Sequence, residues 1–208
     1  MTLASPAEIA ERYRRIRNEV GQGVTVVAAT KYVPAEEMGV LAEAGIEVVG
    51  ENRAQDLEQK HALYGDAFRW HFIGHLQSNK VKVVNRLCEL VHSLSSSTAA
   101  DRLEIPALLE VNLAAEGTKS GVAPEEAAEY VRRYPVVRGL MTMPPLARAA
   151  EESRPYFRRL RELADGLGVP ELSMGTSQDY RVAAEEGATY IRIGEILFRA
   201  EGTAREGG

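Results

Sequence analysis

Cysteine is almost absent from this sequence, because Cys88 is the single one among 208 residues. An internal disulfide is therefore impossible, and a cysteine-based metal site is not expected. No apolar run approaches the roughly 18 residues of a membrane span. The opening residues, MTLASPAEIA, lack the basic stretch and apolar run of a secretory signal. We therefore expect a cytoplasmic protein that does not enter a membrane.

An excess of positive charge is also lacking, since the formal net charge is −5. Proteins that bind nucleic acid usually carry a basic surface, so nucleic acid is not expected as a partner. Arginines do cluster within residues 5–20, but they lie outside the apolar stripe of a helical pattern and fit its solvated side. The arginines are Arg12, Arg14, Arg15 and Arg17, and the stripe is Ile9, Tyr13, Ile16 and Val20.

Long polar tracts and Pro/Gly-rich linkers are missing as well. With 45% hydrophobic residues, the chain has enough apolar side chains for one full core. Its length favours one domain over two. We expect a single domain over 1–208, with a helix at 5–20 and a loose tail at 202–208.

Short apolar or β-branched runs alternate with helical patterns along the chain. This alternation predicts a parallel sheet, and eight strands are the number that closes a (β/α)₈ barrel. An open doubly wound sheet is the structural alternative. A clear amphipathic helix is expected at 155–167, and only a short one fits within 94–105. The expected strands are 24–30, 46–50, 69–74, 89–93, 106–112, 136–142, 170–174 and 189–194, and the stripe of the 155–167 helix is Tyr156, Leu160, Leu163 and Leu167.

A lysine stands at the end of the first expected strand. Side chains alternate along a strand, so Lys31 shares a face with Thr25, Val27 and Ala29. If that face points inward, the lysine lies at the barrel mouth, above small residues that leave room for a flat ring. Partial desolvation there would make its amine a usable nucleophile. A lysine at a strand end is otherwise only a surface group.

The ends of the last two expected strands fit a phosphate pocket, which barrels often form at this place. Ser177 is expected to be the N-cap of the next helix, whose free N–H groups favour an anion. Gly194 lets the backbone approach that anion, with the N–H groups of Gly194 and Glu195 as donors. The alternative is an ordinary cap followed by an ordinary turn.

Two histidines raise the question of a metal site. His71 and His75 are four residues apart, which suits metal binding on a helix. On a strand the same spacing spans about 13 Å, so a zinc pair is not expected. We expect His71 to be a hydrogen-bonded histidine inside the barrel. Glycine signatures for phosphate loops or dinucleotides do not occur.

Seven motifs together resemble the pyridoxal phosphate homeostasis protein family, which is similar to the barrel domain of bacterial alanine racemase. They are AATKYVP, GENRAQD, WHFIGHLQSNK, EGTKSGV, GLMTMPP, LSMGTSQD and IRIGEILF, in that order, within residues 24–198. The resemblance implies an alanine racemase-like barrel that binds pyridoxal 5′-phosphate through a Schiff base on Lys31. It implies a phosphate cradle at Ser177 and the Gly194–Glu195 backbone, and an arginine, Arg192, that faces the pyridine nitrogen. Positions around the ring correspond to Asn52, Ser173 and Met174.

The sequence departs from the family pattern at two places. Glu195 stands where many relatives have a small hydroxyl residue, and its carboxylate must point away from the phosphate or repel it. The segment between the fourth and fifth strands is also shorter than the family usually shows, which concerns the barrel wall and not the site.

The resemblance implies a carrier that binds, shields and releases the cofactor, with apo enzymes as recipients. The alternative is a one-domain amino-acid racemase or lyase. Racemases of this type use a tyrosine from a C-terminal β-domain, whereas this sequence has 16 residues after Arg192. We expect a monomer without catalytic activity. The glycine-containing loop 116–121 is expected at the same barrel face, where Lys119 is either a solvated lysine or a group that assists the transfer.

Overall fold

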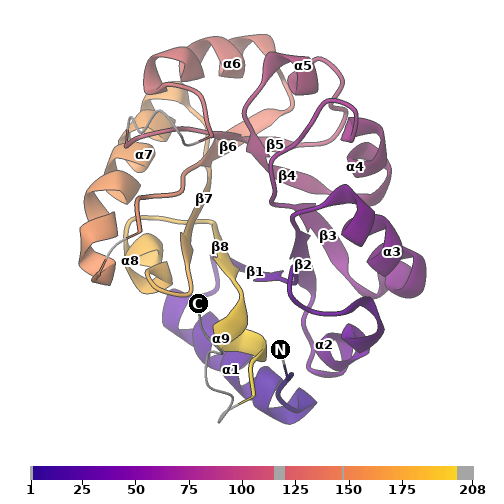
Figure 1. Ribbon diagram of the computed structural model, residues 1–208. Helices are drawn as coiled ribbons and strands as arrows, with labels where there is room; N and C mark the ends of the chain where they lie inside the picture. Colours follow the sequence, from indigo (N-terminus) through magenta and orange to yellow (C-terminus); the bar gives the residue numbers. More distant parts are fainter. Residues whose placement is uncertain (1, 115–119, 147, 201–208) are drawn as a thin grey trace.

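The computed structural model describes residues 2–114, 120–146 and 148–200. Within them, eight parallel strands close into a barrel in which each strand pairs with the next and β8 pairs with β1 (Figure 1). This topology confirms the expected barrel and excludes the open sheet. The strands are β1 Thr25–Ala29, β2 Val48–Glu51, β3 Arg69–Phe72, β4 Leu90–Leu94, β5 Ala107–Glu110, β6 Val137–Met141, β7 Glu171–Thr176 and β8 Tyr190–Ile193.

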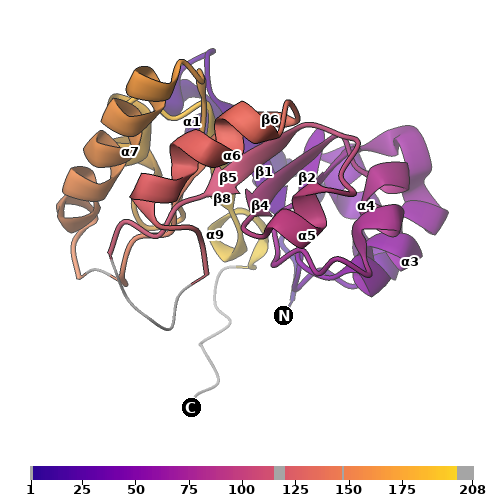
Figure 2. The same cartoon turned by 90° about the horizontal axis from the view of Figure 1, so that it is seen from above.

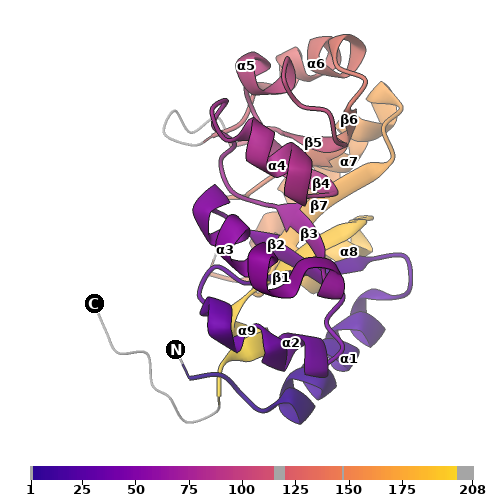
Figure 3. The same ribbon diagram turned by 90° about the vertical axis from the view of Figure 1, so that its right-hand side faces the viewer.

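Helices surround this barrel on its outside (Figures 1 and 2). Figure 3 shows α2 to α6 following one another along one side of the molecule. The helix between β4 and β5 has only four residues, as the segment 94–105 predicted. The α-helices are α1 Pro6–Val20, α2 Gly39–Glu43, α3 Ala54–Tyr64, α4 Val81–Leu87, α5 Ser97–Ala100, α6 Ala127–Arg133, α7 Arg154–Leu167, α8 Tyr180–Glu185 and α9 Glu195–Phe198. Short 3₁₀ turns are η1 Ala35–Glu37, η2 Gly65–Ala67, η3 Pro124–Glu126 and η4 Ala150–Ser153.

The first helix begins with a complete capping box. The Ser5 side chain accepts the N–H of Glu8, and the Glu8 carboxylate accepts the N–H of Ser5. The expected stripe is confirmed, with three residues buried and Val20 partly buried; the buried ones are Ile9, Tyr13 and Ile16. This stripe lets α1 pack against α2, α8 and α9. Of the clustered arginines, three are exposed, and Arg12 donates to the carbonyl of Arg199 at 2.6 Å.

The buried face of α7 is rotated by about one residue from the expected stripe. Phe157, Leu160 and Ala164 are buried, whereas the other expected residues are only partly buried. The ring of Phe157 is fully buried, and Tyr156, which carries a polar hydroxyl, is only partly buried. The small Ala164 then lets the helix approach the sheet.

Apolar residues form two layers separated by the barrel wall. The larger layer lies between the strands and the helices, and a small one fills the interior with Leu90, Leu108, Met141 and the ring of Tyr190. Side chains alternate between the two layers along the regular parts of the strands, and the pairing of β4 with β5 is irregular between Val91 and Leu94. Polar residues in the inward register therefore lie beneath the mouth formed by the C-terminal strand ends. In the described part of the chain, no helix combines the length and the apolar character that a bilayer crossing requires.

Candidate functional site

Four neighbouring strands bring most of the predicted site residues to one side of the barrel mouth. Ala28 pairs with Ile193, and Ala29 pairs with Gly50. Lys31 and Gly194 thus follow adjacent positions of β1 and β8, and Asn52 follows the end of β2. Thr176 of β7 pairs with Arg192 of β8, and Ser177 follows Thr176 in the chain. The strand order β2–β1–β8–β7 therefore places Ser177 beside Lys31, Gly194 and Asn52. Residues far apart in sequence therefore surround one opening.

Lys31 lies in the turn that follows β1 and is exposed. Its Nζ is 4.7 Å from the centroid of the Tyr32 ring, so the ammonium lies over an aromatic face. The partial desolvation expected from the sequence is absent in this structure. Below it, the inward-facing Val27 is fully buried and pairs with Arg192. The lysine is therefore an accessible primary amine at the mouth.

Ser177 and Gly194 lie together, as the predicted phosphate pocket requires. The N–H of Gly194 donates to Ser177 Oγ at 3.4 Å. A Cβ placed on Gly194 would find its nearest neighbour, the Ala29 carbonyl oxygen, at 3.9 Å. The space over this glycine is therefore open to a ligand. An anion there would meet a hydroxyl and a backbone donor.

The expectation that Ser177 caps the next helix is wrong. The N-cap of α8 is Asp179, and Ser177 lies in the preceding turn. The Asp179 carboxylate accepts the backbone N–H of Thr176 at 2.7 Å, which closes this turn. Gly175 precedes this turn with a φ of 90°, and a Cβ at this position would lie 2.5 Å from the Ala183 methyl group. Only glycine therefore fits here. Ser177 therefore belongs to a turn and not to the first turn of α8, whereas Gly194 is the N-cap of the short helix α9.

The Glu195 carboxylate faces a cation along α9. Its Oε2 lies 3.5 Å from the Arg199 guanidinium, a spacing of four residues within one helical turn. Only the backbone of Glu195 therefore remains for an anion at Gly194. The carboxylate is therefore paired within its own helix.

Asn52 and Met174 differ in how they meet the mouth. Asn52 is half-buried after β2, and a Cβ on Gly74 would lie 2.1 Å from its carbonyl oxygen, so only glycine permits this close approach of backbones. Met174 is fully buried in the layer between the strands and the helices. Its side chain therefore faces away from the interior, and only its main chain is available to a ligand at the mouth.

Arg192 is a buried cation held by neutral groups. Its guanidinium donates to Ser173 Oγ, to the Thr142 carbonyl at 3.3 Å and to Met143 Sδ at 2.8 Å. No carboxylate of the described residues forms an ion pair with it. Burial lowers the pKa of Arg192 to about 10, although the nearby carboxylates of Glu110 and Asp179 raise it. The side chain stays charged at neutral pH and has more N–H donors than these partners use.

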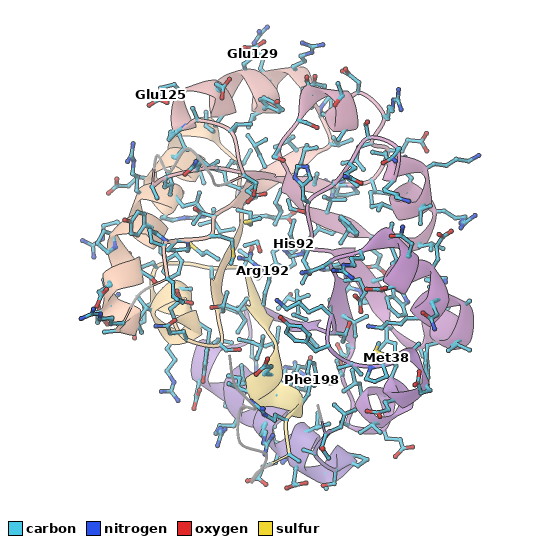
Figure 4. All side chains as sticks on the ribbon, viewed as in Figure 1. Met38, His92, Glu125, Glu129, Arg192 and Phe198 are labelled. Carbon is cyan, nitrogen blue, oxygen red and sulfur yellow. The ribbon has the colours of Figure 1, made fainter. Side chains whose placement is uncertain are left out.

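Ser173 continues into two histidines inside the barrel. His92 Nδ1 lies 2.7 Å from Ser173 Oγ, and His92 Nε2 lies 2.9 Å from His71 Nδ1. Figure 4 shows His92 and Arg192 near the centre of the ring of strands. The hydrogen-bonded histidine predicted at His71 is confirmed. His92 was missed, although its inward register with Leu90 was a signal that the sequence offered.

Burial keeps both imidazoles neutral, and acid should therefore destabilise the fold. Burial lowers the pKa of His71 to about 3, with a smaller effect from Arg69, and lowers the pKa of His92 well below its ordinary value. In the unfolded chain both protonate near pH 6.5. The unfolded state thus binds more protons as the pH falls below about 7, and stability present above that pH is lost.

Protonation of the two histidines in the unfolded chain should lower the free energy of unfolding by roughly 4 kcal/mol between pH 7.5 and pH 5.0. Urea unfolding at both pH values measures this loss. In the double variant His71→Asn with His92→Asn, the pH dependence should shrink by about that amount. The exposed His75→Gln serves as the control. An unchanged pH dependence in the double variant would show that the imidazoles do not cause it.

His71 and His75 lie in different surroundings. His71 is inside β3, whereas His75 lies beyond the strand and is exposed. The part of the chain that the structure covers contains no group of three or more histidine, cysteine or acidic residues that could hold a metal. Most of the loop 116–121, Lys119 included, lies outside the described residues, as does the tail 202–208.

A buried ion pair supports two of the strand ends from outside. Lys60 on α3 lies 2.5 Å from Glu51 Oε1 and donates to the Thr30 carbonyl at 2.8 Å. The Thr30 hydroxyl donates to the same carboxylate oxygen at 2.5 Å. Thr30 directly precedes Lys31 in the chain, and Glu51 directly precedes Asn52. The sequence pattern does not reveal this cluster, because the alternation of buried residues along a strand says nothing about which side chain of a later helix will meet Glu51.

Comparisons with known proteins agree with the motifs. Residues 5–201 match the family described as "Alanine racemase, N-terminal domain". A pyridoxal phosphate homeostasis protein of Aquifex aeolicus is 41% identical over 216 aligned positions, which cover 92% of this chain and 95% of that protein. The protein of the same name from Pseudomonas aeruginosa is 39% identical, with 93% of each chain covered.

A solved structure shows the same barrel with a ligand. PipY of Synechococcus elongatus PCC7942, solved with pyridoxal phosphate bound, is 32% identical and superposes with a TM-score of 0.83 over 91% of this chain and 99% of that chain. A lysine/ornithine decarboxylase of Vibrio vulnificus is 13% identical with a TM-score of 0.72, covering 94% of this chain and 63% of that chain, and so shares the fold alone. The chain belongs to the pyridoxal phosphate homeostasis protein family, built on the alanine racemase N-terminal barrel.

Proposed function

We propose that this protein binds pyridoxal 5′-phosphate at the barrel mouth through a Schiff base on Lys31, and releases it to enzymes that need it. The observation that carries the proposal is the exposed Lys31 amine beside an open Ser177–Gly194 turn and above the buried Arg192 cation. This arrangement matches a flat ring with an aldehyde, an anionic group and a hydrogen-bond acceptor. When bound, the cofactor supplies a reactive aldehyde carbon and a conjugated ring.

Each residue has a separate task in this proposal. Ser177 and the backbone at Gly194 bind the phosphate, and Arg192 donates to the pyridine nitrogen. A donor that stays protonated discourages protonation of that nitrogen, which weakens the ring as an electron sink. Asn52 lies at the ring edge, Ser173 lies beneath it, and Met174 contributes through its main chain. The site thus favours holding the cofactor over catalysis.

The accessibility of Lys31 supports release. If solvent can reach Lys31, an incoming amine can also reach the Schiff base and take over the cofactor, as delivery to an apo enzyme requires. The relatives are named for homeostasis of the cofactor and not for a reaction. We propose a monomeric cytoplasmic carrier, and a racemase or lyase activity is the alternative outcome of the test.

Delivery is measured by mixing the loaded protein with the apo form of an enzyme that depends on this cofactor. The proposal expects that enzyme to regain activity. It also expects amino acids added to the carrier alone to yield no product. Racemisation or elimination at roughly 1 per second or faster would replace the carrier function by an enzymatic one.

Ser177→Ala should weaken cofactor binding ten- to a hundredfold. A hydrogen bond to a charged group contributes about 1.5–3 kcal/mol, and about 1.4 kcal/mol corresponds to a factor of ten. Titration followed by absorbance measures the affinity, and Ser97→Ala, an exposed serine on α5, is the matched control. Pyridoxal without its phosphate should bind far more weakly to the wild type. Equal affinities for the two vitamers would disprove the phosphate pocket.

A further inference from the structure

A continuous line of polar groups crosses the apolar interior of the barrel. It begins at Arg192 on β8, passes Ser173 on β7 and His92 on β4, and ends at His71 on β3. The relative exposures of these four residues lie between 0 and 7%. The Tyr190 ring packs edge-on against both imidazoles, at centroid distances of 5.9 and 5.2 Å. Packing against the ring and the strands leaves the imidazoles little freedom to rotate.

The donors and acceptors of this line can be assigned from its charged end. Guanidinium groups only donate, so Ser173 Oγ accepts from Arg192. The serine hydroxyl must then donate to its other partner, His92 Nδ1. A neutral His92 with an unprotonated Nδ1 carries its proton on Nε2 and donates to His71 Nδ1. Every bond therefore runs in one direction, away from the arginine.

We infer that Ser173, His92 and His71 form a positioning relay that fixes the Arg192 guanidinium for the ring nitrogen of the cofactor. This inference rests on the proposed function. Hydrogen bonds that run in one direction polarise one another, and a cation at the head strengthens the effect. The relay stabilises the arginine with dipoles in direct contact, and Glu110 and Asp179 act on it only from a distance, without forming an ion pair. A direct carboxylate would neutralise its charge, whereas dipoles leave that charge available to the ligand.

The assigned protons are measured on the protein without cofactor. Long-range ¹H–¹⁵N correlation spectra distinguish imidazole tautomers, and His71→Asn and His92→Asn identify the two signals. The relay predicts neutral Nε2–H tautomers for both histidines at neutral pH. Ser173→Ala should change the His92 tautomer signal, because the donor to Nδ1 is lost. An Nδ1–H tautomer or a charged imidazole at His92 in the wild type would overturn the inference.

Two substitutions of His92 separate positioning from packing. An asparagine oxygen near the Nδ1 position can still accept from Ser173, whereas leucine fills more of the volume and accepts nothing. The relay predicts about tenfold weaker binding of pyridoxal 5′-phosphate for His92→Leu and less than about threefold for His92→Asn. A packing role alone predicts the reverse order, because asparagine leaves the larger cavity.

The visible spectrum of the loaded protein provides a further measurement. The pH dependence of its main absorption band reports the ring environment. His92→Leu should shift this dependence, and His92→Asn should retain the wild-type curve. Equal shifts in both variants, or none in either, would overturn the relay. If the wild type binds no cofactor, the proposed function fails, and the tautomer spectra still decide the relay.

Discussion

Lys31→Ala should remove all covalent attachment of pyridoxal 5′-phosphate while the fold persists. The substitution deletes the one amine that the structure presents in the turn after β1, and this turn is at the mouth and not in the core. Borohydride reduction followed by peptide mapping should find the label on Lys31 in the wild type and no label in the variant. Circular dichroism should be unchanged.

The matched control is Lys80→Ala, which removes a lysine from another loop. It should retain the full label on Lys31. If reduction of the wild-type protein labels Lys80 or Lys119 instead, the proposed attachment site is wrong. Non-covalent binding of pyridoxal 5′-phosphate should survive in Lys31→Ala, because Ser177 and Gly194 remain to bind its phosphate. The affinity of this variant then measures the contribution of the phosphate pocket without that of the Lys31 amine.

Lys60→Met should destabilise the protein by about 3–5 kcal/mol. Both side chains of the Lys60–Glu51 pair are buried, with exposures of 5% and 0%. Removal of the lysine leaves the Glu51 carboxylate charged without a cation, and breaking a buried pair from one side carries a cost of about this size. Urea or thermal unfolding measures the loss.

Two further variants identify the cause. Adding Glu51→Gln to Lys60→Met removes the stranded charge and keeps an acceptor for Thr30, so most of the lost stability should return. Arg86→Met disrupts a surface pair with Glu58, whose side chains are 64% and 46% exposed, and should cost less than about 1 kcal/mol. If the buried and surface substitutions have equal effects, the pair does not support the strand ends as described.

Local patterns predicted the elements well because each depends on neighbours in sequence. The expected eight strands overlap the observed ones, and the cap at Ser5 and the short helix near 97–100 follow from adjacent residues. Alternation also grouped Thr25, Val27 and Ala29 on one face of β1, and Val27 of this face pairs with Arg192. The predicted cap at Ser177 failed because α8 begins only at Tyr180, after a turn in which the Asp179 carboxylate accepts the N–H of Thr176. Local preferences do not specify such a turn between a strand and a helix.

The sequence by itself determined the barrel and the order in which polar residues leave its strands, because side-chain periodicity and turn chemistry act over a few residues. Only the tertiary structure decided which of these residues meet. Strand register joins Ser177 to Gly194, and barrel closure aligns Arg192, Ser173, His92 and His71 from four strands. Such partners are separated by up to 81 positions in the chain, so no local pattern can specify their contact.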